Sequence, residues 1–404
     1  MSFGAHEIEW EPPDLSDPSL YADGDAEAIW AAQRKREPVY WNERAAAEGF
    51  WSVLSHPLAN GVLRDSTTFV SSRGMRLDSP PVPTAQASGR VLIVSDPPRH
   101  GSIRRIISSA FTPRTVRRLE TNIRRTASKL VENAVAAGEC DAVQMAARLP
   151  VSVICDMLGV PQQDWEHLLK LTMTAFGSGV DREIEIEANS EILLYYEHLV
   201  KLRRRDPGDD VVSALVHGEV DGVPFSDEEV ILNCNALLTA GTETTRHASV
   251  GGLLAFIDFP DQWRRLRDDP GLMSTAVQEI LRYTSPIMHV MRTAAGDTKI
   301  GDQDISDGDK VAIWLPAANR DDSVFDDPDR FDIGREPNRH LALSAGTHFC
   351  LGSSLAITEL GVLFGELLKQ MDHAEPAGSP RRLHSNFIWG FETAPVTLKR
   401  HRAG

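Results

Sequence analysis

The chain has 404 residues, 42% of them apolar, which is enough to build a large hydrophobic core. Its formal net charge of −16 at pH 7 argues against nucleic acid as a partner. No signal segment and no run of about 18 apolar residues occurs, so we expect a monomeric cytoplasmic protein without a membrane anchor.

The length would allow two or three domains, but the chain has no Gly/Ser/Pro-rich linker, internal repeat or low-complexity run. We therefore expect one domain over residues 1–404, with an acidic, loosely ordered segment at 1–25. The four cysteines, Cys140, Cys155, Cys234 and Cys350, form no CxxC pair, so neither a disulfide framework nor a zinc site is indicated.

The first predicted elements are two short strands, 38–41 and 50–54, that form a hairpin. Residues 66–95 are rich in Ser, Pro and Gly and read as a long functional loop. Asp96-Pro97-Pro98 then opens a helix on which His100 and Arg104 share a face. Such a pair of donors could hold an anionic group, but an ordinary exposed His/Arg pair has the same spacing.

Thr112-Pro113 is an N-cap followed by Pro at the first helical position, which predicts a helix to about Ala137. Basic residues are concentrated in this part of an otherwise acidic chain. They are either a solvated helix face or a docking surface for an acidic partner, and comprise Arg99, Arg104, Arg105, Arg114, Arg117, Arg118, Arg124, Arg125 and Lys129.

Ser226 and Glu229 form a capping-box pattern at the start of a helix predicted to run to about Asp258. A helix so much longer than average must cross the whole domain, which favours a mainly α protein with small β-sheets. The small residues Ala240 and Gly241 interrupt it, and Glu243 and Thr244 follow. This pattern fits a kinked surface helix, or a groove over a bound ligand to which Glu243 and Thr244 deliver protons.

Glu279 and Arg282 are spaced three residues apart on the next predicted helix, as in a common helix salt bridge. Arg292 follows alone, and an Asp/Pro-rich run at 319–331 leads to the segment 343–352. There Cys350 lies just ahead of an apolar helical repeat, where helix N–H groups favour a thiolate. A lone cysteine is usually a small buried apolar residue, but this one is also a plausible axial ligand for haem iron.

Together these segments resemble the cytochrome P-450 family of haem-thiolate monooxygenases, specifically its soluble bacterial members, from about residue 38 to the end. The family's cysteine loop, Phe-Gly-x-Gly-x-His-x-Cys-x-Gly, is matched at Gly346, His348, Cys350 and Gly352. The first two positions differ, because Leu343 and Ser344 replace Phe and Gly.

The resemblance implies a long central helix over a buried haem b whose iron is bound by Cys350. It implies that Glu243 and Thr244 are catalytic and that Glu279, Arg282 and Arg330 form a structural network. The remaining haem contacts that it implies are His100, Arg104, Arg292, His348, Ala240, Gly241, Gly346, Gly352 and Leu343.

The implied reaction is hydroxylation or epoxidation, with dioxygen, of a medium-to-large, mostly apolar molecule such as an antibiotic or another secondary-metabolite intermediate, free or tethered to a carrier protein. Electrons would come from NAD(P)H through an external ferredoxin-type donor and its reductase. The implied pocket residues are Leu237, Leu238, Ile287, Met288, His289, Val290, Ile388 and Trp389.

Three alternatives remain open. A coupling or crosslinking oxidase of the family would keep every motif. A non-catalytic binding protein of this fold would not need Cys350, and a peroxide-driven enzyme would not need Glu243 and Thr244.

Overall fold

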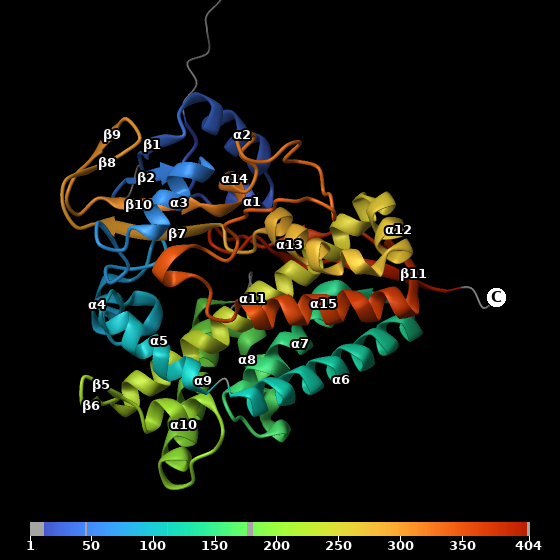
Figure 1. The fold of residues 1–404 in the computed structure, drawn as a ribbon, viewed down its shortest axis with the longest axis horizontal. Coiled ribbons are helices and arrows are strands. Elements are labelled where there is room, and N and C mark those ends of the chain that lie inside the picture. The colour runs from blue at the N-terminus through green and yellow to red at the C-terminus, as the bar shows by residue number, and fades with distance from the viewer. Residues whose placement is uncertain (1–11, 45–46, 111, 176–180, 402–404) are drawn as a thin grey trace, which may run out of the picture.

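The computed structural model describes residues 12–44, 47–110, 112–175 and 181–401 (Figure 1). The helices are α1 Ser19–Ala22, α2 Ala26–Arg36, α3 His56–Arg64, α4 Pro81–Ala87, α5 Arg99–Ser109, α6 Pro113–Ala137, α7 Ala142–Met157, α8 Trp165–Ala175, α9 Arg182–Arg205, α10 Val211–Val216, α11 Asp227–Asp258, α12 Pro260–Asp268, α13 Met273–Thr284, α14 Leu315–Ala318 and α15 Ser353–Gln370.

The strands are short and lie mostly in the N- and C-terminal parts of the chain. They are β1 Val39–Asn42, β2 Phe50–Val53, β3 Phe69–Val70, β4 Glu139–Asp141, β5 Glu219–Val220, β6 Val223–Pro224, β7 His289–Ala294, β8 Thr298–Ile300, β9 Gln303–Ile305, β10 Lys310–Trp314, β11 Met371–Pro376, β12 Arg381–Arg382, β13 Phe391–Thr393 and β14 Pro395–Arg400. The prediction of a mainly α fold with small sheets is confirmed.

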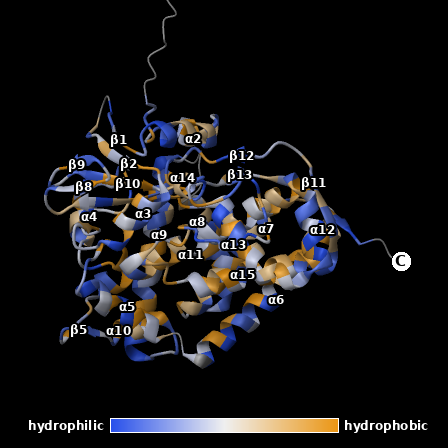
Figure 2. Cartoon of the chain, turned by 45° about the horizontal axis from the view of Figure 1, so that its top comes forward, coloured by the Kyte–Doolittle hydropathy of each residue, from blue (hydrophilic) through white to orange (hydrophobic). Residues whose placement is uncertain are grey.

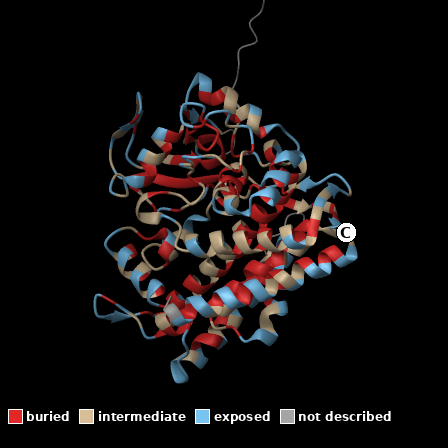
Figure 3. Cartoon of the chain, turned by 45° about the vertical axis from the view of Figure 1, so that its right-hand side comes forward, coloured by how far each residue is buried: buried red, intermediate tan, exposed pale blue. Residues whose placement is uncertain are grey.

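Helix α11 is the central element, and α7, α9, α13 and α15 pack against it (Figure 1). Its start is the predicted capping box, in which the Glu229 N–H donates to Ser226 Oγ at 3.2 Å and the Ser226 N–H donates to Glu229 Oε2 at 2.9 Å. Gly252 lets α13 and α15 approach, since a Cβ there would lie 2.9 Å from both Ile280 and Phe364. Figure 3 shows that burial is concentrated on these central helices and on β7 and β10.

Helix α6 begins and ends where the sequence predicts, and it is amphipathic. Leu119, Ile123, Ala127 and Val131 recur every four residues and are buried, while Arg117 and its basic neighbours face solvent. Figure 2 shows the resulting alternation of apolar and polar turns along α6.

The predicted hairpin is present, with Val39 opposite Val53 and Asn42 opposite Phe50 in an antiparallel pair. It forms the edge of a five-stranded sheet with the order β1-β2-β10-β7-β3. Residues 66–95 are more regular than expected, because they contain β3 and α4.

The expectation of a loosely ordered segment at 1–25 is wrong for its described part. Leu15 and Tyr21 are buried, and Tyr21 packs in an aromatic cluster with Trp30, Trp314 and Trp389. The Leu15 N–H donates to the Asn42 side chain at 2.9 Å, which ties this segment to β1. Residues 1–11 lie outside the described part. Among the described residues, no helix has both the length and the apolar character that crossing a membrane requires.

Candidate active site

Cys350 lies in a tight loop just before α15, as its position in the sequence predicts. The loop is closed by the Cys350 N–H, which donates to the Leu343 carbonyl at 2.9 Å. Gly346 has a φ of +66°, and a Cβ there would lie 2.6 Å from the Leu63 carbonyl oxygen, so only glycine fits. A Cβ on Gly352 would instead meet open space. The loop is therefore braced by α3 on one side and open beside the cysteine.

Burial raises the pKa of the Cys350 thiol, although the Gly352 N–H and the positive charge of Arg104 act in the opposite direction. These two groups alone therefore do not hold the sulfur as a thiolate. A bound metal cation would deprotonate it. Without such a cation, the raised pKa leaves the thiol protonated at neutral pH and therefore a poor nucleophile.

Four cationic or basic side chains gather beside this loop, from α5, β7 and the loop itself. The rings of His100 and His348 lie 4.2 Å apart between centroids, and within the part of the chain that the structure describes both ring nitrogens of the buried His100 lack a hydrogen-bond partner. Arg292 is 3% exposed, and among the described residues it forms no salt bridge. Its guanidinium donates to the Met291 carbonyl at 2.9 Å, and Arg104 donates to the Phe349 carbonyl at 2.8 Å.

Burial, and to a smaller extent the positive charge of Arg292, lower the pKa of His348 to about 3. Burial also lowers the pKa of Arg292 to about 10, while the negative charge of Asp96 opposes this shift. Unpaired buried donors are costly unless an anion satisfies them. The cluster of His100, His348, Arg292 and Arg104 can therefore accept an anionic ligand, for which the unpartnered nitrogens of His100 and the buried guanidinium of Arg292 are the main groups.

The middle of α11 is more exposed than its C-terminal half, which is largely buried. Ala240 is exposed and Thr244 half-buried, and the Thr244 hydroxyl donates to the Ala240 carbonyl at 2.8 Å. Gly241 makes a different contact from the one expected, because its Cα faces α7: a Cβ there would lie 2.3 Å from Ile154. The exposed side of α11, where the sequence predicts a groove, thus lies along Ala240 and Thr244, whereas Gly241 faces α7.

Glu243 does not point into solvent. It is 4% exposed and forms an ion pair with the buried Arg246, while Nε2 of His247 lies 3.6 Å from its Oε2. The sequence prediction missed Arg246 and His247. The available signal was three consecutive polar residues at 245–247 within a helix that must be buried.

The predicted network around Glu279 is present with one correction. Glu279 and Arg282 are fully buried and form two hydrogen bonds of 2.8 Å. The third side chain is Arg335, whose Nε lies 3.2 Å from Glu279, and not Arg330. Arg330 is exposed and contributes only its carbonyl, which accepts from Arg282 at 3.1 Å. The prediction of Arg330 was wrong because the run 328–335 folds back, which local spacing does not reveal.

The predicted pocket residues fall into two groups. Leu237, Ile287 and Ile388 are partly exposed, and Ile287 and Ile388 pair in an isolated β-bridge. The others are already packed in apolar clusters: Leu238 with the helical core, Val290 with the sheet, and Met288 and Trp389 with the N-terminal aromatic cluster.

His289 braces the predicted pocket wall. Its Nε2 accepts the Leu77 N–H at 3.0 Å, so its Nδ1 carries the proton and donates to the Asn386 carbonyl at 3.0 Å. Burial lowers the pKa of His289 to about 4. The neutral ring therefore ties together segments 66–95 and 385–389.

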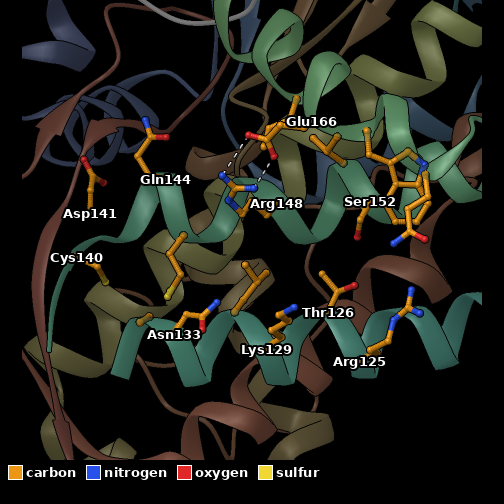
Figure 4. Close-up of a pocket in the computed structure, with 17 residues that line it drawn as sticks. Arg125, Thr126, Lys129, Asn133, Cys140, Asp141, Gln144, Arg148, Ser152 and Glu166 are labelled. Carbon is orange, nitrogen blue, oxygen red and sulfur yellow. Dashed lines mark hydrogen bonds and ion pairs between the residues drawn. The ribbon is translucent and has the colours of Figure 1, made fainter. Parts of the chain in front are cut away.

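A separate groove of about 760 Å³ lies between α6, α7 and α8 (Figure 4). Arg148 crosses it to pair with Glu166, at 2.6 Å. None of its lining residues belongs to the site described above.

Comparison with known proteins agrees with this geometry. Residues 271–399 match the family model of cytochrome P-450. The cytochrome P-450 NovI of Streptomyces niveus is 37% identical over 96% of this chain and 97% of its own length. The chain belongs to the cytochrome P-450 family. Linalool 8-monooxygenase of Pseudomonas putida is 35% identical over 96% of this chain and 99% of its own length.

The fold is equally well matched among solved structures. The crystal structure of the P-450 OxyD, involved in the biosynthesis of vancomycin-type antibiotics, superposes with a TM-score of 0.89 at 35% identity. The match covers 96% of this chain and all of that one. The chain is accordingly a cytochrome P-450 monooxygenase, an oxidoreductase whose family implies haem.

The residues present fit that cofactor. Cys350 offers a sulfur ligand, Gly352 leaves space beside it, and the cluster of His100, His348, Arg292 and Arg104 could hold the carboxylates of a haem. The unpartnered nitrogens of His100 carry most weight, because a buried ring with neither nitrogen bonded needs an external partner.

Proposed function

We propose that this cytochrome P-450 hydroxylates or epoxidises a medium-to-large, mostly apolar molecule, and that Glu243 and Thr244 supply the protons. The observation that carries the proposal is the open face of α11, where the Thr244 hydroxyl stands beside exposed Ala240 and adjoins a buried carboxylate. Bound haem would supply the reduction and splitting of dioxygen, with Cys350 as its sulfur ligand.

The side chains then act as follows. The Thr244 hydroxyl donates to Ala240, so its oxygen remains free to accept a hydrogen bond from water in the groove. Glu243 is held by Arg246 in an ion pair, so it must leave that partner and take up a proton from water before it can pass one toward Thr244.

The substrate we propose is uncharged where it meets the wall of Leu237, Ile287 and Ile388. These partly exposed side chains are apolar, and a drug-sized ligand is bound mostly by such surface. Linalool 8-monooxygenase is named for linalool, and OxyD is involved in the biosynthesis of vancomycin-type antibiotics, which supports a natural-product intermediate.

We further propose that electrons from NAD(P)H arrive through an acidic ferredoxin-type protein and its reductase. Arg105, Arg114 and Arg117 are exposed on α5 and α6 and are therefore available to it. Arg118 is less available, because it pairs with Asp156 at 3.0 Å.

The test is the yield of product per NAD(P)H consumed in Thr244→Ala. Yield should fall while haem content and substrate affinity persist. Thr242→Ala is the matched control, since Thr242 makes the same kind of bond, to Leu238 at 2.9 Å, on the buried side. Equal yields in both variants would remove Thr244 from the reaction. With ¹⁸O₂, label in the product supports oxygen insertion, and a coupled product without label contradicts it.

A further inference from the structure

One residue of the buried cluster of Glu243, Arg246 and His247 also contacts an element outside α11. The side chain of His247 has no exposed surface, and its Nδ1 accepts the Phe391 N–H of β13 at 3.3 Å. One imidazole ring thus connects the helix that carries the acidic residue to the strand that follows the pocket wall at 385–389.

The tautomer of this ring follows from its neighbours. Its Nε2 lies 3.2 Å from the Arg246 guanidinium, a donor, and 3.6 Å from the Glu243 carboxylate, an acceptor. A neutral ring cannot accept at both nitrogens. Arg246 already has Glu243 as acceptor, whereas the Phe391 N–H depends on Nδ1, so Nδ1 is bare and Nε2 carries the proton.

Burial, and the charges of Arg246 and Arg382, lower the pKa of His247, and Glu243 opposes them. The ring is therefore neutral at pH 7. Its Nε2–H stands just beyond hydrogen-bond distance of Glu243, as a second donor beside Arg246. A small turn of Glu243 away from Arg246 would close that bond.

Gly390 fixes where this ring stands. A Cβ at Gly390 would lie 2.5 Å from Nδ1 of His247, so no other residue lets the strand come so close. Gly390 also follows directly on the wall segment, in which the Met288 N–H donates to Phe387 and the Trp389 N–H donates to Pro286, both at 2.8 Å.

We propose that His247 is a positioning residue for Glu243, and that it couples the acidic residue to the pocket wall at 385–389 through the strand that follows it. The proposal rests on the proposed role of Glu243 in proton delivery. When Glu243 leaves Arg246, the Nε2–H of His247 receives the carboxylate and holds it near the groove. The strand sets the position of the ring. A shift of the pocket wall on substrate binding therefore changes the distance between Nε2 of His247 and the Glu243 carboxylate.

The first test is the ring tautomer, by ¹⁵N NMR of histidine-labelled holoenzyme in the diamagnetic reduced carbon monoxide complex. The His247 signal, assigned by its loss in His247→Gln, should show Nε2–H, and Glu243→Gln should shift it. An Nδ1–H tautomer would overturn the proposal.

The second test compares His247→Leu with His247→Gln in product per NAD(P)H. Leu keeps the volume and loses both bonds, whereas Gln can accept from Phe391 and donate to Glu243. We expect Leu to lower the yield about fivefold, as for the loss of the single hydrogen bond to Glu243, and to change the substrate affinity less than about twofold. Gln should recover most of the lost yield. An equal loss in both variants, or an affinity loss as large as the yield loss, would show a merely structural residue.

Gly390→Ala should lower the yield as His247→Leu does, because it displaces the ring. Gly296→Ala, where a Cβ meets open space, is the control. If Thr244→Ala and Glu243→Gln leave the yield unchanged, the proposed proton route fails as a whole. If they lower it and the His247 and Gly390 variants do not, the role of His247 alone is refuted.

Discussion

The network around Glu279 allows a sharp test, because two arginines five residues apart are expected to differ. Glu279 is fully buried and also accepts the Asp332 N–H at 2.9 Å and the Asn338 amide at 3.0 Å. Arg335, with a side chain 10% exposed, pairs with Glu279 and also donates to the backbone at Asp326, Asp327 and Arg330. Arg330 itself has its side chain in solvent.

The magnitudes follow from these contacts. Arg335→Gln removes charge-assisted hydrogen bonds worth about 1.5–3 kcal/mol each, of which we expect a net loss of about 2.5 kcal/mol in the free energy of unfolding. Arg330→Gln should change it by less than about 0.5 kcal/mol, as for other exposed sites. Glu279→Gln leaves Arg282 buried without its counter-charge and should cost about 3–5 kcal/mol.

Urea denaturation of the haem-loaded protein, followed by far-UV circular dichroism, measures these differences. With an m-value of about 3 kcal/mol per M, Arg335→Gln should lower the midpoint by roughly 0.8 M and Arg330→Gln by a fraction of that shift. Equal midpoints for the two variants, or a larger shift for Arg330→Gln, would refute the assignment of Arg335 as the third member.

Three further predictions concern the cysteine loop, the pocket wall and the basic surface. Leu343→Phe should lower the haem reduction potential, because an aromatic ring beside the sulfur restricts the hydrogen-bond donors that reach it; redox titration of substrate-free protein that finds no change or a rise would make Leu343 a packing residue only. The pKa of His289 is about 6.5 in the unfolded chain and about 4 in the folded protein. Between these two pH values the ring is therefore mostly protonated when the chain is unfolded and mostly neutral when it is folded. The stability it contributes is therefore complete above pH 6.5 and is lost as the pH falls toward 4. His289→Gln should flatten that dependence of the urea midpoint, and an unchanged slope would contradict it. Charge reversal at Arg105 and Arg117 should slow reduction by a ferredoxin-type donor at low salt and abolish the salt dependence of the rate. A reduction rate that changes with neither the substitutions nor the salt concentration would show that these arginines are only a solvated helix face.

The sequence was sufficient for features fixed by local spacing. The capping box at Ser226 and Glu229, the N-cap at Thr112, and Cys350 ahead of α15 all depend on residues within one or two helical turns. The family follows from several such motifs in a fixed order, and its comparison with NovI confirms it.

Other features could not be predicted, because they depend on segments that meet only in the folded chain. Arg335 reaches Glu279 through a loop that folds back. Position 241 requires glycine because Ile154 of α7 occupies the space that a Cβ would need, which the sequence of α11 does not reveal. The approach of Phe391 to His247 likewise joins residues 144 positions apart.

The central claim is that Cys350 binds the haem iron as a thiolate. The most direct measurement is the absorption spectrum of the reduced carbon monoxide complex in the parent and in Cys350→Ser. The parent should give the red-shifted band typical of a thiolate ligand, and the variant should lose it, because a hydroxyl does not replace a soft anionic sulfur. A variant that keeps this band would show that another residue binds the iron, and the account of the site would be wrong.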